Sequence, residues 1–219
     1  MTLTRSREPI PTNYAISNCP LPAALTIKLL GVTVSSDLRW NSHIDTVRRK
    51  SIAILGILAK CFRGGKAKFT RLLYISLVRS KLLYGIPSWS PTTMVNMEKL
   101  ERVQSRATFL ILGYKAAARL TRDLRLAACK LPSLSATIDS NTLTFFCKCL
   151  AGSYDLNVFG TNRVSIKARR EGLRGGLTTL VTPRSTCNYY LASFFPRAVS
   201  LFNALDEKVK QKWLSVIPN

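Results

Sequence analysis

Acidic residues and histidine are scarce in this sequence, and this limits the chemistry that it can perform. The 219 residues contain 11 Asp and Glu and a single histidine, His43, against 33 Lys and Arg, so the formal net charge is +22. Two-metal phosphoryl transfer needs carboxylates that converge on a pair of cations. The only adjacent acidic pair, Asp206 and Glu207, lies in a polar C-terminal segment and fits a helix start or a surface feature better. We therefore expect no catalytic residues.

Long apolar runs and metal-ligand clusters are missing as well. The longest apolar stretch, residues 52–59, is less than half of the roughly 20 residues that span a bilayer, and no signal-peptide pattern opens the chain. The closest cysteines, Cys147 and Cys149, are two positions apart and would not share a helix face. We expect reduced thiols, no structural metal or other cofactor, no transmembrane segment, and an intracellular location that is nuclear or cytoplasmic.

The hydrophobic pattern predicts a mainly α fold with a short N-terminal β element. Residues 26–34 are rich in β-branched and apolar side chains and predict one strand. Ser42 and Asp45 form a possible capping box, after which apolar residues recur at helical spacing as far as Gly64 and Gly65. Further helices are expected over residues 66–83, 93–112, 117–128 and 134–151 and from about residue 193, with a loop-rich stretch over residues 153–185 that holds one strand at most.

Positive charge is concentrated in one part of the chain. No acidic residue occurs between Asp45 and Glu98, whereas solvated helix faces ordinarily mix both signs. Such a stretch can neutralise phosphates without reading bases, although a merely solvated basic face stays open. The aromatic residues within it, such as Phe69, follow helical spacing and are expected in the core. The candidate nucleic-acid-binding residues in this interval are Arg48, Arg49, Lys50, Lys60, Arg63, Lys66, Lys68, Arg71, Arg79 and Lys81.

A series of short segments resembles the reverse transcriptases of non-LTR retrotransposons (LINE elements of the jockey-like kind). The segments follow one another in the family's order over roughly residues 26–210. They are Leu30-Gly31-Val32-Thr33 with Asp37-Leu38, Trp40 and His43-Ile44; Leu73-Tyr74 with Tyr84-Gly85 and Trp89-Ser90-Pro91; Leu100-Glu101 with Gln104 and Arg106-Ala107; Leu131-Pro132-Ser133-Leu134; and Ser193-Phe194-Phe195-Pro196-Arg197-Ala198.

The resemblance implies the thumb of an RNA-directed DNA polymerase and the region behind it, without the catalytic palm. Residues 1–40 would then be a lead-in and β element from the end of the palm, residues 41–152 a helical thumb-like bundle, and residues 153–219 a basic, loop-rich segment with a C-terminal helix. The chain would bind RNA, DNA or an RNA–DNA hybrid non-specifically, take no small-molecule substrate, and be inactive alone. Two alternatives are a longer active reverse transcriptase whose palm is encoded upstream, and a helical module that binds an anionic protein or membrane surface.

Overall fold

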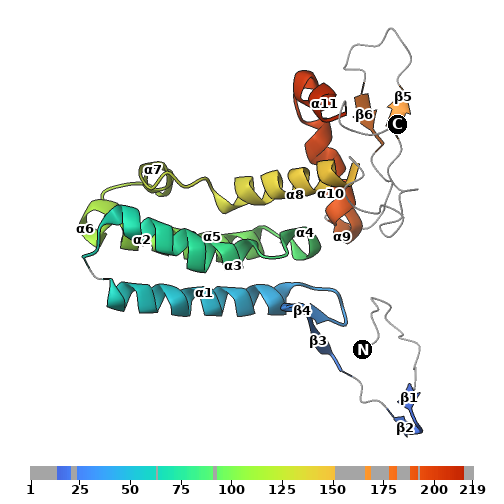
Figure 1. Cartoon of the computed structure of the whole chain (residues 1–219), viewed down its shortest axis with the longest axis horizontal. Helices are drawn as coiled ribbons and strands as arrows, with labels where there is room; N and C mark the ends of the chain where they lie inside the picture. The colour runs from blue at the N-terminus through green and yellow to red at the C-terminus, as the bar shows by residue number, and fades with distance from the viewer. Residues whose placement is uncertain are drawn as a thin grey trace. The chain divides into compact units, whose positions relative to one another are not determined.

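The computed structural model describes residues 14–20, 24–62, 64–90, 93–150, 166–168, 178–181, 188–191 and 193–214. The chain divides into two compact units, and each is discontinuous in sequence. The first comprises Met1–Gly85 and Thr93–Leu131, and the second comprises Ile86–Thr92 and Pro132–Asn219. The described residues are mainly helical with short two-stranded sheets, so the predicted fold class is confirmed (Figure 1). The domain boundaries expected at residues 40 and 152 stay a prediction.

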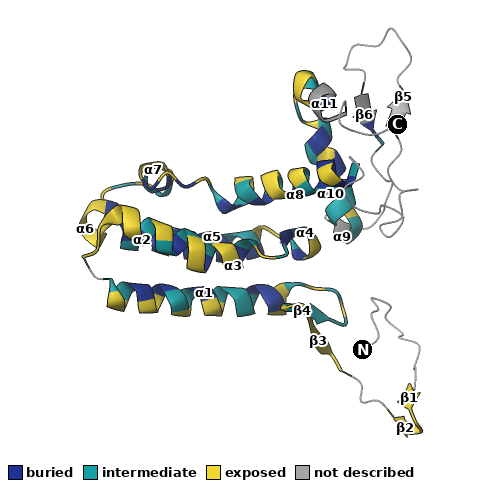
Figure 2. Cartoon of the chain, viewed as in Figure 1, coloured by how far each residue is buried: buried dark blue, intermediate teal, exposed yellow. Residues whose placement is uncertain are grey.

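Helices make up the body of the first unit. The long helix α1 contacts both α5 and the run η1–α3, while α5 also contacts α2, α6 and α7. Buried apolar side chains such as Ile44, Tyr74 and Leu100 fill the space between these helices, and exposed residues lie on their outer faces (Figure 2). The bounds are α1 (Asn41–Cys61), α2 (Ala67–Leu73), the π-helical η1 (Tyr74–Arg79), α3 (Ser80–Leu83), α5 (Met94–Leu112), α6 (Tyr114–Ala117) and α7 (Arg122–Ala128).

Two details of α1 and of the run that follows it differ from the sequence-based expectation. The capping box is wrong, because Trp40 is the N-cap of α1 and makes no side-chain cap hydrogen bond there. Phe69, expected in the core, is 47% exposed, and the buried face of α2–η1–α3 carries Thr70, Tyr74, Val78 and Leu82 instead. The π-helical turn closes over five residues rather than four. Like the buried set, Phe69, Leu73 and Leu77 are four residues apart, so spacing alone does not show which of the two sets is buried.

The β element at the N-terminal end is a hairpin and not the single strand expected over residues 26–34. Strand β3 (Thr26–Leu29) pairs with β4 (Val32–Ser35) in antiparallel register. The two turn residues, Leu30 and Gly31, have φ values of 46° and 87°, and positive φ at both positions is the signature of a tight hairpin turn. The Tyr84 hydroxyl donates a hydrogen bond of 3.0 Å to the Leu30 carbonyl. A second small hairpin precedes it, formed by β1 (Ala15–Ile16) and β2 (Cys19–Pro20).

The second unit is organised around α8 (Leu134–Leu150) and α10 (Phe194–Asn203). Its core contains Phe146 from α8, Leu180 from β6, and Val199 and Phe202 from α10. Arg197 donates hydrogen bonds to Asp139 of α8, at 2.5 Å, and to Ser90. The remaining elements of this unit are α4 (Ile86–Trp89), β5 (Ile166–Ala168), β6 (Thr178–Leu180), α9 (Asn188–Leu191) and α11 (Glu207–Leu214). The pairing of β5 with β6 corrects the expectation of at most one strand over residues 153–185.

The only histidine joins the β3–β4 hairpin to α1. His43 is 3% exposed, and its Nδ1 accepts a hydrogen bond of 3.1 Å from the Thr33 backbone N–H. This bond requires Nδ1 without a proton. Burial, with the charge of Lys50 as a smaller cause, lowers the pKa of His43. His43 is therefore a structural residue that is held in its neutral form.

This geometry predicts a pH-dependent stability. Because the pKa of His43 is lower in the folded than in the unfolded chain, the unfolded chain binds more protons in the window below the unfolded value of about 6.5. The free energy of unfolding should be constant between pH 7 and 8 and should decrease as the pH falls below about 6.5. Thermal unfolding followed by circular dichroism from pH 8 to 5 would measure this. In the control variant His43→Asn, an amide carbonyl replaces Nδ1 as acceptor, and the decrease should disappear; an unchanged pH profile would refute the assignment.

Candidate nucleic-acid interface

Nine of the ten basic residues singled out in the sequence belong to the described part of the first unit, whereas Arg63 lies outside the described residues. All nine lie on α1 or on the run from the N-cap of α2 to α3. Arg48, Arg71 and Arg79 are half-buried. The other six are exposed, and we call them the basic face: Arg49, Lys50, Lys60, Lys66, Lys68 and Lys81.

Helix α1 sets the spacing of the charges at one side of the basic face. Arg49 and Lys60 are separated by three helical turns, about 16 Å along the axis at 1.5 Å per residue. Ala53 and Gly56 lie between them on the same exposed side of the helix. No acidic residue of α1 follows Asp45, and Asp45 is paired with Lys99 of α5 at 2.9 Å. The field at this surface is therefore positive along most of the helix.

The turn from α1 to α2 brings further cations close to Lys60. It is ordered by a hydrogen bond of 3.0 Å from the Gly65 N–H to the Phe62 carbonyl, and by an edge-on contact between Phe62 and Phe69, whose ring centroids are 5.5 Å apart. Exposed Lys66 and Lys68 follow within eight residues of Lys60. The described residues on either side of Arg63 thus concentrate positive charge at this turn.

Arg71 stabilises the packing of the first unit through hydrogen bonds to backbone carbonyls. Its guanidinium donates hydrogen bonds to the backbone carbonyls of Cys129, at 2.7 Å, and Lys130, at 3.0 Å. These carbonyls lie just past the end of α7, where a helix leaves acceptors unsatisfied and carries partial negative charge. Arg71 thus ties α2 to the C-terminal end of α7. A basic residue used in this way contributes little to a phosphate-binding surface.

Four further exposed cations were not predicted, because they follow Glu98 and therefore lie outside the acid-free stretch. Arg106 on α5, Lys115 on α6, Arg119 after α6, and Lys130 are exposed. None of these four side chains takes part in an ion pair within the described ranges. Arg106 could have been found from spacing alone, because it lies five residues after Glu101 and thus outside the i,i+4 distance of an intrahelical pair.

The acidic residues of α5 are neutralised within the first unit. Arg122 of α7 contacts Glu98 and Glu101, each at 3.1 Å. Its hydrogen bonds and charge hold the pKa of Glu98 below the ordinary value. The one-turn spacing of the two glutamates on a helix is typical of a solvated face; this holds for Glu98, which also pairs with Arg102, but Glu101 is only 6% exposed. The difference arises because α7 packs on α5, which the sequence pattern does not indicate.

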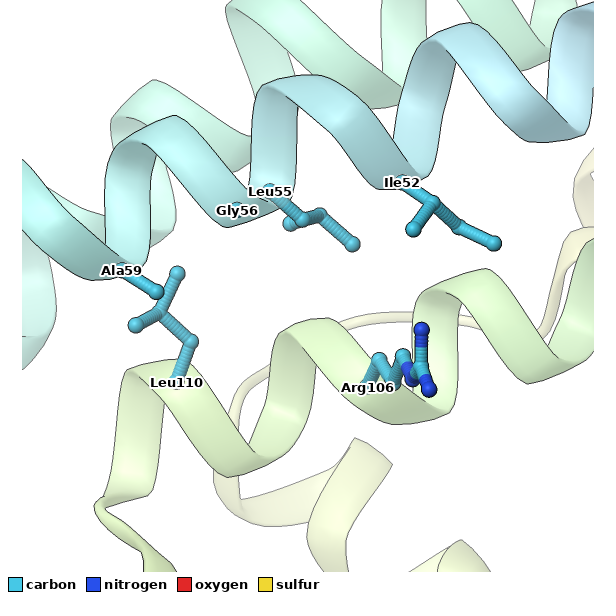
Figure 3. Close-up of a pocket in the computed structure, with 6 residues that line it drawn as sticks. All are labelled: Ile52, Leu55, Gly56, Ala59, Arg106 and Leu110. Atoms are coloured by element: carbon cyan, nitrogen blue, oxygen red, sulfur yellow. The ribbon is translucent and has the colours of Figure 1, made fainter.

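A groove between α1 and α5 lies next to the exposed side of α1 that carries Arg49 and Lys60. Its volume is about 230 Å³. Apolar side chains from both helices project into it, and the Arg106 side chain lies along its edge (Figure 3). The lining residues are Ile52, Leu55, Gly56, Ala59, Arg106 and Leu110. Gly56 leaves open space on its outer side, since a Cβ added there would meet no atom within 4 Å.

The chain is similar to a protein of a known retrotransposon. This relative is a 115 kDa protein in the type-1 retrotransposable element R1DM of Drosophila melanogaster, and it is 27% identical over 109 residues, or 48% of this chain. The match supports a retrotransposon-related origin. The matched segment spans only 11% of the length of the R1DM protein. No family model and no solved structure matches the chain.

The described residues also bear on the membrane and metal expectations. None of the described helices is both long enough and apolar enough to cross a bilayer. In the same residues, no three His, Cys, Asp or Glu side chains gather in a way that could hold a metal ion. Five cysteines in these ranges are free thiols, and burial raises the pKa of Cys147 to about 11. Cys147 is therefore a protonated core residue at neutral pH.

Proposed function

We propose that this chain binds RNA, DNA or an RNA–DNA hybrid without sequence preference, through contacts between its basic face and phosphates. The observation that carries the proposal is the basic face itself: six exposed cations on α1, α2 and α3, in an interval with no acidic residue. Phosphate contacts supply most of the affinity in non-specific binding and carry no sequence information. The retrotransposon-related origin is in keeping with such a partner.

We also propose which part of a retrotransposon protein this chain corresponds to. The chain corresponds to the thumb and the following region of a non-LTR reverse transcriptase, and alone it has no polymerase activity. The ordered segments that resemble this family support the first part. The second part is supported by the use of the carboxylates, because Asp45, Glu98, Glu101, Asp139 and Glu207 each pair with a Lys or Arg side chain. The matched segment is 11% of the R1DM protein, so the alternative that this chain is part of a longer, active enzyme stays open.

The salt dependence of binding tests the first proposal. If each of the six cations of the basic face neutralises one phosphate, the logarithm of the association constant should fall with the logarithm of the salt concentration with a slope of about −5. The affinity for a duplex should then fall about 10³-fold between 50 and 200 mM salt. Fluorescence anisotropy with labelled duplexes of two unrelated sequences would measure both the slope and the lack of sequence preference. A slope near zero, or a strong preference for one sequence, would contradict the proposal.

Two further measurements separate the alternatives. Primer extension with the chain alone, template, nucleotides and Mg²⁺ should give no product, and templated synthesis would show that the chain is catalytic. Sedimentation with anionic liposomes tests a membrane surface as the partner. Binding to liposomes that exceeds binding to duplex at the same salt concentration would favour the membrane and overturn the nucleic-acid proposal.

A further inference from the structure

We propose that the groove between α1 and α5 holds one unpaired nucleobase of a single strand whose phosphates are bound by the basic face. This inference rests on the proposed function and adds a preference for strands that carry an unstacked base. A base in a duplex is paired and stacked and cannot enter a groove between two helices, whereas the bases of a single strand can be turned out and bound.

The size of the groove fits a single ring system. A volume of about 230 Å³ is below the roughly 300 to 1,000 Å³ of pockets for drug-sized ligands. It is larger than the cavity of about 150 Å³ that is known to hold a benzene molecule. The lining of Ile52, Leu55 and Leu110 offers an apolar surface to a ring face, and the absence of a side chain at Gly56 keeps one side of the groove open.

Arg106 supplies the polar contact at the edge. It is exposed and takes part in no ion pair among the described residues, and its side chain lies beside the apolar lining (Figure 3). A guanidinium is planar and stacks on bases, and it can also donate hydrogen bonds to their edges or to a phosphate. A lysine at this position would supply the positive charge but has no planar group that could stack on a base. The groove thus combines an apolar wall with a flat cation.

The charges around the groove select a nucleic acid over an apolar peptide or a lipid tail. Gly56 belongs both to the groove and to the exposed side of α1, where Arg49 and Lys60 lie on either side of it. The two cations are about 16 Å apart along the helix axis. A strand that follows α1 can therefore contact both cations with its phosphates while a base between them reaches the groove.

A comparison of strands with and without bases tests this inference. The probes are a labelled 12-residue oligo(dA), an abasic strand of the same length, and a 12-base-pair duplex. Contact of the Arg106 guanidinium with the face of a base corresponds to about a two- to fivefold gain in affinity, so wild-type protein should bind oligo(dA) at least about twofold more tightly than the abasic strand. Gly56→Leu, which fills the groove, and Arg106→Lys, which keeps the charge, should both lose this preference. Neither variant should change the affinity for the duplex or its salt slope.

Gly56→Ala is the matched control for folding, because it adds one methyl group where space is open and favours the helix. It should retain most of the preference, with an unchanged circular dichroism spectrum. Equal binding of oligo(dA) and abasic strand by wild-type protein, together with a normal salt slope, would overturn the groove inference and leave the phosphate proposal intact. A retained preference in Gly56→Leu would also overturn it. Absence of salt-dependent binding to all three probes would overturn both proposals.

Discussion

Simultaneous replacement of Arg49, Lys50 and Lys60 by alanine is expected to lower the affinity for a duplex by about 10²- to 10³-fold at 0.1 M salt. Each lost phosphate contact removes about 0.9 from the slope of log affinity against log salt. Three contacts therefore remove about 2.7, which is 2.7 decades of affinity between 1 M and 0.1 M salt. All three side chains are exposed, and alanine is the strongest helix former, so helix α1 should remain intact. Anisotropy titrations at several salt concentrations measure the change.

The control for this prediction has the same change in net charge. Lys28, Lys148 and Lys208 are exposed and lie outside the basic face, on β3, α8 and α11. Their combined replacement by alanine removes three positive charges but should change the slope by less than about 1, because the slope counts the cations that contact phosphates and these three are not among the proposed contacts. Equal losses in the two triple variants would show that net charge, and not the basic face, determines binding.

The largest expected loss of stability comes from the core of the second unit. Phe202 is fully buried, and its ring is 6.1 Å from that of Phe146, in an edge-on contact. Replacement of a buried Phe by Ala costs about 3 to 5 kcal/mol, because the transfer of the ring out of water is lost and a cavity remains. That cost is comparable with the total stability of many domains, about 5 to 15 kcal/mol. Urea denaturation of Phe202→Ala, followed by circular dichroism, measures it.

Leu191→Ala provides the comparison in the same unit. Leu191 is 41% exposed on α9, and substitutions on the surface usually change the free energy of unfolding by no more than about 0.5 kcal/mol. If Phe202→Ala destabilises the protein no more than Leu191→Ala does, the packing of α10 on α8 is not the core of this unit.

The positions of the long helices α1, α5 and α8 could be predicted from the sequence because they depend on local patterns, whereas the single helix expected over residues 117–128 is wrong: α6 (Tyr114–Ala117) ends at its first residue and α7 (Arg122–Ala128) begins inside it. Gly64 and Gly65 end α1 close to where we expected, and Gly113, with φ at 80°, ends α5. The hairpin was missed because the turn consists of Leu30 and Gly31, and only the glycine is typical of such turns. The buried side of α2–η1–α3 was missed because Phe69 and the buried Thr70 begin two sets of residues with the same spacing of four, and the packing of neighbouring helices decides which set is buried.

The basic composition of the candidate interface could be predicted from the sequence, but the contacts of its individual side chains could not. A run of basic residues without acids is visible in the sequence, whereas the partner of each side chain depends on contacts between distant segments. Arg71 illustrates the limit, since its two acceptors lie 58 and 59 residues away. Arg122 is another case, because it neutralises acids 21 and 24 residues earlier. The groove between α1 and α5 likewise depends on the packing of two helices and has no local signature.

The interleaved order of the two units has a consequence for dissecting the protein. Residues 86–92 belong to the second unit, although they lie between two stretches of the first. A truncation after residue 131 would keep α4 but remove α8, against which α4 packs. Ile86 and Trp89, both fully buried in the intact chain, would lose that cover and be prone to self-association. A fragment that begins at residue 132 would lack the same two side chains. Neither fragment obtained by a single cut therefore contains one complete unit and nothing else, and the activity of a unit cannot be measured on such a fragment.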